Sequence, residues 1–110
     1  MDIPDLDPRS FQSLLKLGGK KKLDALMELL QGSGPERVQE LLGAKSLDEA
    51  KAAAKVLKSS AANLGLAALE DTCDQILAAK SWAPRHPLAL EAQSRLAKGQ
   101  AALKQARASI

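Results

Sequence analysis

The sequence predicts an all-α protein, an antiparallel up-and-down four-helix bundle with a short leading helix. Hydrophobic residues make up 45% of the chain but aromatic residues only 2%, so leucine and alanine must build most of the core. β-branched and aromatic residues, which suit the surface of a sheet, are scarce. Apolar residues recur every three or four positions, and short connections favour antiparallel helical neighbours. The 110 residues suit a single domain, which we expect to span 1–110.

The leading helix is predicted from its two ends. Asp7 is a residue type that commonly caps a helix N-terminus, and Pro8 suits the first helical position. Gly18 and Gly19 interrupt the apolar run that follows. The first helix is therefore expected to end before the paired glycines.

Two helical segments are expected next, over 20–31 and 35–42. The stretch GSGP at 32–35 should separate them, because glycine and proline interrupt helices. Pro35 suits the first position of the second segment, and Gly43 or the following Ala44-Lys45 ends it. The apolar positions expected to face the core are Leu23, Leu26, Met27, Leu30, Val38, Leu41 and Leu42.

A capping box indicates the helix that runs from 47 to 64. Ser46 and Glu49 have the spacing in which each side chain satisfies a free backbone N–H at the helix start. Gly65 then permits a left-handed turn. The apolar positions behind this box are Leu47, Ala50, Ala54, Leu57, Ala61 and Leu64.

Two more helices, over 66–80 and 88–106, complete the expected bundle. The first carries an apolar stripe that includes Cys73, which we interpret as a small core residue. Between them SWAPRHP contains two prolines and must leave the helix. We expect Trp82 to anchor one end of the bundle and His86 to be an ordinary loop residue.

Charge and cysteine content restrict the partners and the compartment. The formal net charge is +3, which permits an acidic partner without requiring one. Cys73 is the only cysteine, so no internal disulfide can form and a cytoplasmic location fits. The first residues lack the basic and apolar regions of a signal peptide, and no apolar run approaches the length of a bilayer span. We therefore expect no membrane partner.

The segment that suggests a function is AKVLKSSAANLG, from Ala54 to Gly65. It resembles the signature of histidine-containing phosphotransfer (HPt) domains, in which a helix reads Ala-His-x-Leu-Lys-Gly-Ser-Ser-Ala-Asn-Leu-Gly. Leu69 and Cys73 supply the Leu-x-x-x-Cys spacing of the following helix. The motifs LDP and LGG and the apolar stripe after them resemble the family's leading segments in order. The resemblance covers roughly residues 6–80 and implies a helical bundle that works in phosphorelay signalling.

Two positions depart from the family pattern. Lys55 stands at the place of the phosphate-accepting histidine, and Ser59 replaces a glycine that leaves access for the partner. Lys58 and Ser60 match the family's lysine and small hydroxyl residue. A lysine amine is protonated at neutral pH, with a nucleophilic fraction of roughly a thousandth or less. The resemblance therefore implies a degenerate member that is no enzyme and carries no phosphate.

The helical period places Lys55 opposite the apolar stripe, on the solvated face. The resemblance implies a response-regulator receiver domain or a histidine kinase as partner, and receiver domains present an acidic pocket that a protruding ammonium group would suit. The expected contact face comprises Lys51, Lys55, Lys58, Ser59 and Ala62, with Leu29 of a neighbouring helix as an apolar rim.

Other functions stay open at this point. The chain could be a phosphorelay carrier that uses another residue, such as His86, or a small basic helical protein that binds nucleic acid or serves as a structural subunit. The run Lys20, Lys21, Lys22 could touch phosphates but is more simply a solvated helix start. One histidine and one cysteine do not suffice for a typical zinc site, and we expect neither metal nor cofactor. A monomer is the favoured oligomeric state.

Overall fold

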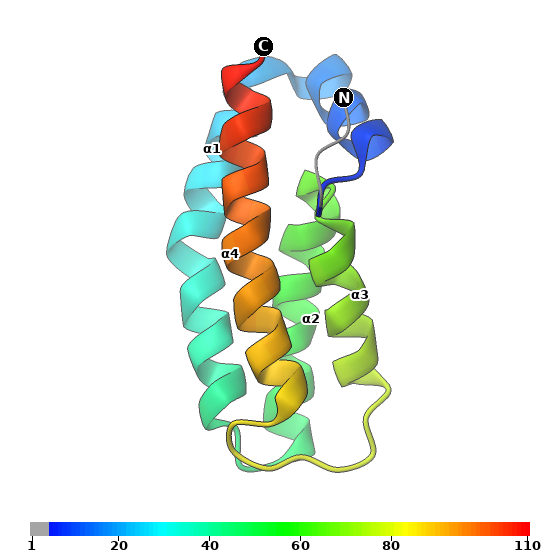
Figure 1. Cartoon of the computed structure of the whole chain (residues 1–110), viewed down its shortest axis with the longest axis vertical. Coiled ribbons are helices and arrows are strands. Elements are labelled where there is room, and N and C mark those ends of the chain that lie inside the picture. The colour runs from blue at the N-terminus through cyan, green and yellow to red at the C-terminus, as the bar shows by residue number, and fades with distance from the viewer. Residues whose placement is uncertain (1–4) are drawn as a thin grey trace.

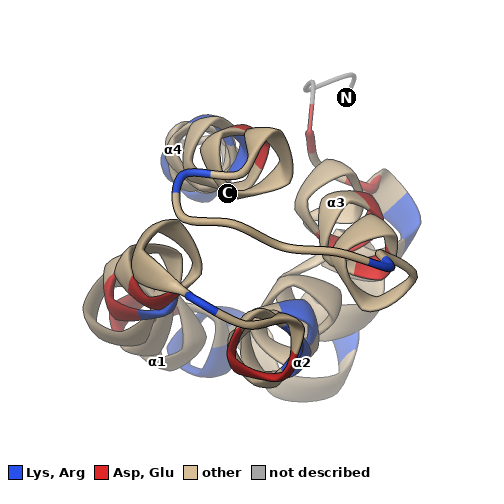
Figure 2. Cartoon of the chain, turned by 90° about the horizontal axis from the view of Figure 1, so that it is seen from below, with Lys and Arg blue, Asp and Glu red and all other residues tan. Residues whose placement is uncertain are grey.

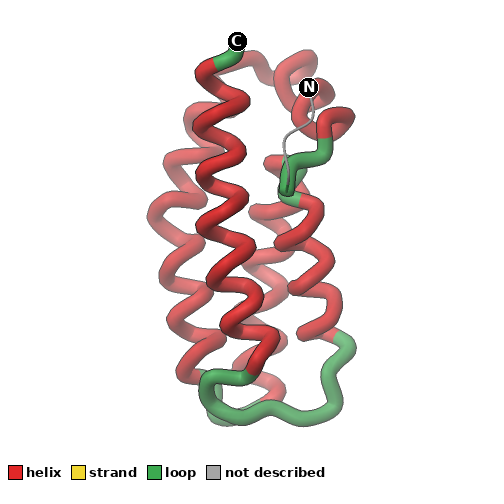
Figure 3. Tube along the Cα trace, in the orientation of Figure 1, coloured by secondary structure: helices red, strands yellow, loops and turns green. Residues whose placement is uncertain are grey.

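Four α-helices make up the regular structure of residues 5–110 (Figures 1 and 3). The computed structural model describes residues 5–110, so residues 1–4 of the predicted domain lie outside the described part. Within that part every regular element is helical, as the composition predicts. The helices are α1 (Pro8–Gly43), α2 (Leu47–Leu64), α3 (Ala67–Leu77) and α4 (Pro87–Ala108).

The helices surround one core. Each contacts two others: α1 packs on α2 and α4, and α3 packs on the same two. Figure 1 shows the helices lying along the long axis, and Figure 2 shows them from below around a common centre. The molecule measures 41 × 23 × 19 Å. No helix in residues 5–110 combines the length and the apolar character needed to cross a membrane.

α1 continues through the GSGP stretch, so the prediction of separate helices over 20–31 and 35–42 is wrong. Leu30, Gly34 and Val38 are all buried, which means that the apolar face keeps its phase across the stretch. A Cβ on Gly34 would lie 3.1 Å from Leu96 Cδ1, so the glycine allows α4 to pack closely here. A proline inside a helix costs about 3 kcal/mol, and burial of this continuous face outweighs that cost.

A real interruption of α1 occurs at Gly19. Its backbone has φ 70° and ψ −173°, which is not helical, and it lies where the paired glycines predict a break. The segment before it, 8–18, is attached to the turn between α2 and α3. The backbone N–H of Asp7 donates to the carbonyl of Gly65 at 2.7 Å, and Phe11 is buried in the core.

The ends of α2 form as their sequence signals predict. Ser46 Oγ accepts a hydrogen bond from the Glu49 N–H at 3.2 Å, as predicted. The Glu49 carboxylate accepts one from the Lys45 N–H at 2.8 Å, one residue before the Ser46 N–H that a capping box uses. At the other end Gly65 adopts the left-handed conformation, with φ 73°. These local interactions define where α2 begins and ends.

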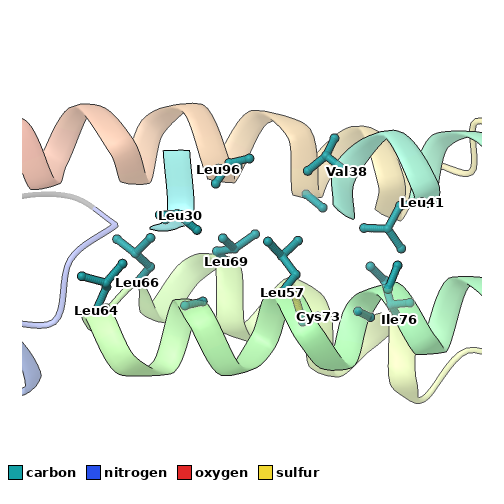
Figure 4. Close-up of a cluster of buried hydrophobic side chains, with 14 of the residues drawn as sticks. Leu30, Val38, Leu41, Leu57, Leu64, Leu66, Leu69, Cys73, Ile76 and Leu96 are labelled. Atoms are coloured by element: carbon teal, nitrogen blue, oxygen red, sulfur yellow. The ribbon is translucent and has the colours of Figure 1, made fainter. Parts of the chain in front are cut away.

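The core consists mainly of leucine and alanine side chains (Figure 4). Phe11 is its one fully buried aromatic residue among those described. Alanines on α2 and α4 and the glycine at 99 let the helices approach closely, and a Cβ on Gly99 would lie 3.0 Å from Leu66 Cδ1. Cys73 is buried among these side chains, as predicted.

The connection between α3 and α4 is longer than expected, because α3 ends at Leu77 and not near residue 80. Trp82 lies half-buried against the core at this end, and its ring stacks on that of His86 with centroids 4.2 Å apart. His86 is more than an ordinary loop residue: its Nδ1 accepts a hydrogen bond from the Leu88 N–H at 3.0 Å and caps α4.

Replacing Gly65 with alanine should lower the free energy of unfolding by about 2 kcal/mol, because a left-handed non-glycine residue is strained. The new Cβ would also lie 3.0 Å from Ser10 Cβ and 3.3 Å from the Asp7 carbonyl oxygen. Urea unfolding followed by circular dichroism measures the change. Gly32→Ala is the matched control: it adds a Cβ that meets nothing within 4 Å and should stabilise α1 by up to about 1 kcal/mol. Equal effects of the two substitutions would contradict this account.

Candidate functional site

Lys55 lies on the outward face of α2. Its neighbours Ala54 and Leu57 are buried, and the helical period therefore directs the lysine side chain into solvent. No ion pair within residues 5–110 involves its ammonium group. Ser59, one turn later, is also exposed and donates its hydroxyl to the Lys55 carbonyl oxygen at 3.3 Å.

Four of the predicted face residues follow one row along α2. Lys51, Lys55, Ser59 and Ala62 are spaced by four, four and three positions, so they are neighbours on the helix surface. Lys55, Ser59 and Ala62 are exposed, and Lys51 is half-buried. The structure thus brings these four side chains together as an uncovered surface, which we call the α2 row.

Lys58 lies beside the α2 row but is turned toward α3. Its ammonium group forms an ion pair with the carboxylate of Asp74, and both side chains remain partly exposed. The hydrogen bond and the charge of Asp74 raise the pKa of Lys58. Lys58 is therefore a neutralised neighbour, whereas Lys55 is a cation that a partner can reach without displacing a carboxylate.

Leu29 lies on α1 and exposes 62% of its surface. It borders a shallow hollow of about 460 Å³ whose other walls are small or acidic residues: Ala25, Glu28, Gly32, Ser33 and Glu36. A short connection joins the end of α1 at Gly43 to the start of α2 at Leu47. A residue of α1 and a residue of α2 that are equally far from this connection therefore lie at the same height along the bundle. Leu29 is thus level with the end of α2 that carries Ala62.

Val56 is an exposed apolar residue of this region that the sequence pattern does not single out. It exposes 45% of its surface. Successive helical residues are about 100° apart, so Val56 and Lys58 flank the buried Leu57 on opposite sides. Because Lys58 contacts α3, Val56 lies on the flank toward α1. The helical period leaves Val56 out of the apolar stripe of α2, but only the exposed fraction shows that α1 does not cover it.

A further hollow, of about 610 Å³, lies between α1 and α4. Asp24, Met27 and Gln31 line it from α1, and Gln100 and Lys104 line it from α4. These residues belong to the opposite flank of α1 from Leu29. The hollow is therefore separate from the α2 row.

Cys73 is buried in the core, near enough to the Lys58–Asp74 pair for both charges to act on its thiol. Burial raises the pKa of its thiol from the ordinary 9.0 to about 12, and the carboxylate of Asp74 adds to the shift. The thiol is therefore protonated and unreactive at neutral pH. Among residues 5–110 no group of three or more histidine, cysteine, aspartate or glutamate side chains is arranged to hold a metal ion.

Comparison with known proteins returned no match to a family model, to a curated protein or to a solved structure. Two observations therefore bear on the function: the local geometry of the α2 row, and the resemblance of its sequence to the HPt signature.

The stability of the protein should fall as the pH rises from about 9 toward about 12, in part because of Cys73. The unfolded chain loses the thiol proton near its ordinary pKa, whereas the folded chain retains it up to about 12, so alkaline pH favours unfolding. Chemical denaturation at several pH values should give a shallower alkaline loss for Cys73→Ala than for the natural protein. Identical slopes would show that the thiol is accessible to water in the folded state.

Proposed function

We propose that the protein is a pseudo-HPt signalling protein that binds a receiver domain or a histidine kinase without carrying phosphate. The observation that carries this proposal is Lys55, an exposed cation on the outward face of α2 at the histidine position of an HPt-like motif. We further propose that the four helices form the antiparallel up-and-down bundle of that family, with 8–18 as its leading helix. Such a role belongs in the cytoplasm.

The charge of Lys55 supports a binding role. An acidic pocket on a partner attracts a protruding ammonium group, and this attraction strengthens when water is excluded from the contact. Ser59 and Ala62 are small and Lys51 is half-buried, so Lys55 is the most prominent side chain of the α2 row. Leu29 and Val56 add exposed apolar surface on the α1 side, which a partner would cover.

The same residue argues against phosphate transfer. A protonated amine has no free electron pair with which to attack phosphorus, whereas a neutral imidazole has one. The remaining imidazole, that of His86, stacks on Trp82 and uses Nδ1 to cap α4. A carrier function through His86 would have to give up that cap if Nδ1 were the phosphorylated atom.

Reversing the charge at the centre of the α2 row tests the binding role. Lys55→Glu should weaken binding to the cognate receiver domain at least tenfold, because a carboxylate would face the acidic pocket. Calorimetric titration against the receiver domains of the source organism measures this. The control is Lys45→Glu, which makes an equal charge change at an exposed position just before the N-terminus of α2. No binding by the natural protein, or equal binding by both variants, would contradict the proposal.

Removing the carboxylate that pairs with Lys58 should strengthen binding to the receiver domain, whereas Lys55→Glu weakens it. Asp74→Asn removes the ion pair and lowers the pKa of Lys58, while its ammonium group stays charged at neutral pH and becomes available to the partner. Binding to the same receiver domain should strengthen several-fold. Asp71→Asn, at an exposed position one turn earlier on α3, controls for the general loss of a negative charge.

Incubation with a phosphorylated receiver domain separates the binding role from a carrier role. The natural protein should acquire no acid-labile phosphate, and Lys55→His tests whether an imidazole at this position restores transfer. Acid-labile label on the natural protein at Lys55 or His86 would overturn the pseudo-HPt proposal in favour of a phosphorelay carrier.

A further inference from the structure

The joint within α1 presents an exposed leucine among lysines. Leu17 exposes 85% of its surface, more than any other large hydrophobic residue among those described. Lys16 precedes it, and Lys20, Lys21 and Lys22 follow Gly19 at the start of the next helical stretch, all four exposed. We call residues 16–22 the basic tip.

The shape of the basic tip leaves it open to a large partner. Gly19 breaks the helix, and a Cβ built on it would meet nothing within 4 Å. Figure 1 places this joint at the end of the molecule where the C-terminus lies. Ile110, another exposed apolar residue, is the last residue of the chain at this end. Apolar surface and positive charge therefore share one end of the bundle.

The lysines of the basic tip form no ion pair with neighbouring acids among the described residues, although Lys20 is near enough to Asp24 for the two charges to attract. Asp24 lies one turn beyond the lysine run, but its carboxylate is paired with Arg107 of α4 at 2.7 Å. No ion pair within residues 5–110 involves the four lysines. A partner that supplies many negative charges on one surface would complement this end.

We propose that the basic tip binds the surface of an anionic phospholipid membrane, with Leu17 inserted at the headgroup boundary and the lysines on the lipid phosphates. A single protruding apolar side chain surrounded by basic residues combines the two contributions that hold a peripheral protein on such a surface. No described helix can span a bilayer, so the contact is peripheral. The proposal revises the expectation of no membrane partner, which depended on the absence of a signal peptide and of a spanning segment.

The placement of the aromatic residues favours lipid over nucleic acid. Single-stranded nucleic acid is usually held by bases that stack on exposed aromatic side chains. Phe11 is buried, and Trp82 belongs to the connection at the opposite end of the bundle (Figure 1). An exposed leucine has no comparable partner in a nucleic acid, whereas an acyl boundary can bury it.

The proposal uses residues other than those of the α2 row, so the two can fail separately. The surfaces adjoin, however, because Leu17 and Ala62 line the same shallow hollow of about 400 Å³. Membrane contact at the basic tip would leave Lys55 on the side of the bundle, free to meet a protein partner.

Cosedimentation with vesicles tests the proposal on the full chain. The natural protein should bind vesicles of phosphatidylcholine mixed with phosphatidylserine, should bind pure phosphatidylcholine weakly, and should lose binding as salt is raised. Leu17→Ser should weaken binding several-fold. Its control is Leu90→Ser, which changes another exposed leucine near the opposite end, on the first turns of α4.

The lysines are tested as a set. The triple variant Lys20→Gln, Lys21→Gln, Lys22→Gln should bind the anionic vesicles at least a hundredfold more weakly, at roughly fivefold for each lysine. The control set Lys45→Gln, Lys80→Gln, Arg85→Gln removes the same charge from the opposite end. Circular dichroism verifies that each variant is folded.

The results separate the alternatives. Equal loss in both triple variants, no loss in Leu17→Ser, or no binding to anionic vesicles would overturn the proposal. Tighter binding to single-stranded DNA than to vesicles, lost in the Lys20–Lys22 variant, would replace it with a nucleic-acid surface. Lys55→Glu should leave vesicle binding within about twofold, so a failure of receiver binding leaves this result intact.

Discussion

Close approach of the helices through alanine and glycine is the constraint on which the rest of the structure depends. A chain with so few aromatic residues cannot fill wide gaps, so the helices must lie near one another. Gly34 admits Leu96, and Gly99 admits Leu66, each at a distance that an added Cβ would make tight. Because the core is closed in this way, every helix has a defined inner face and a defined outer face.

That constraint explains both the path of α1 and the position of the site. Burial of one continuous apolar face keeps α1 helical through Pro35, although local preference favours a break there. On α2 the buried alanines leave Lys55 and Ser59 on the opposite side. The α2 row and the basic tip are therefore adjoining surfaces made of different residues, and each presents exposed positive charge.

The sequence predicted the elements whose signals are local. The side-chain cap at Ser46, the left-handed turn at Gly65 and the break at Gly19 depend on a few neighbouring residues, and all three form. The GSGP prediction was wrong because helix continuity there depends on packing against α4, which no local pattern contains. The outward placement of Lys55 followed from the helical period, which is a local property as well.

The sequence by itself determined the helical class, the ends of α2, the burial of Cys73 and the exposure of Lys55, because each follows from composition, capping or a period of 3.6 residues. Only the tertiary structure decided that Asp74 neutralises Lys58, that Val56 is exposed and that Leu17 stands out among lysines. Those facts depend on which helices become neighbours and on how much of each flank they cover. Contacts between residues far apart in the chain set both, and a single sequence does not state them.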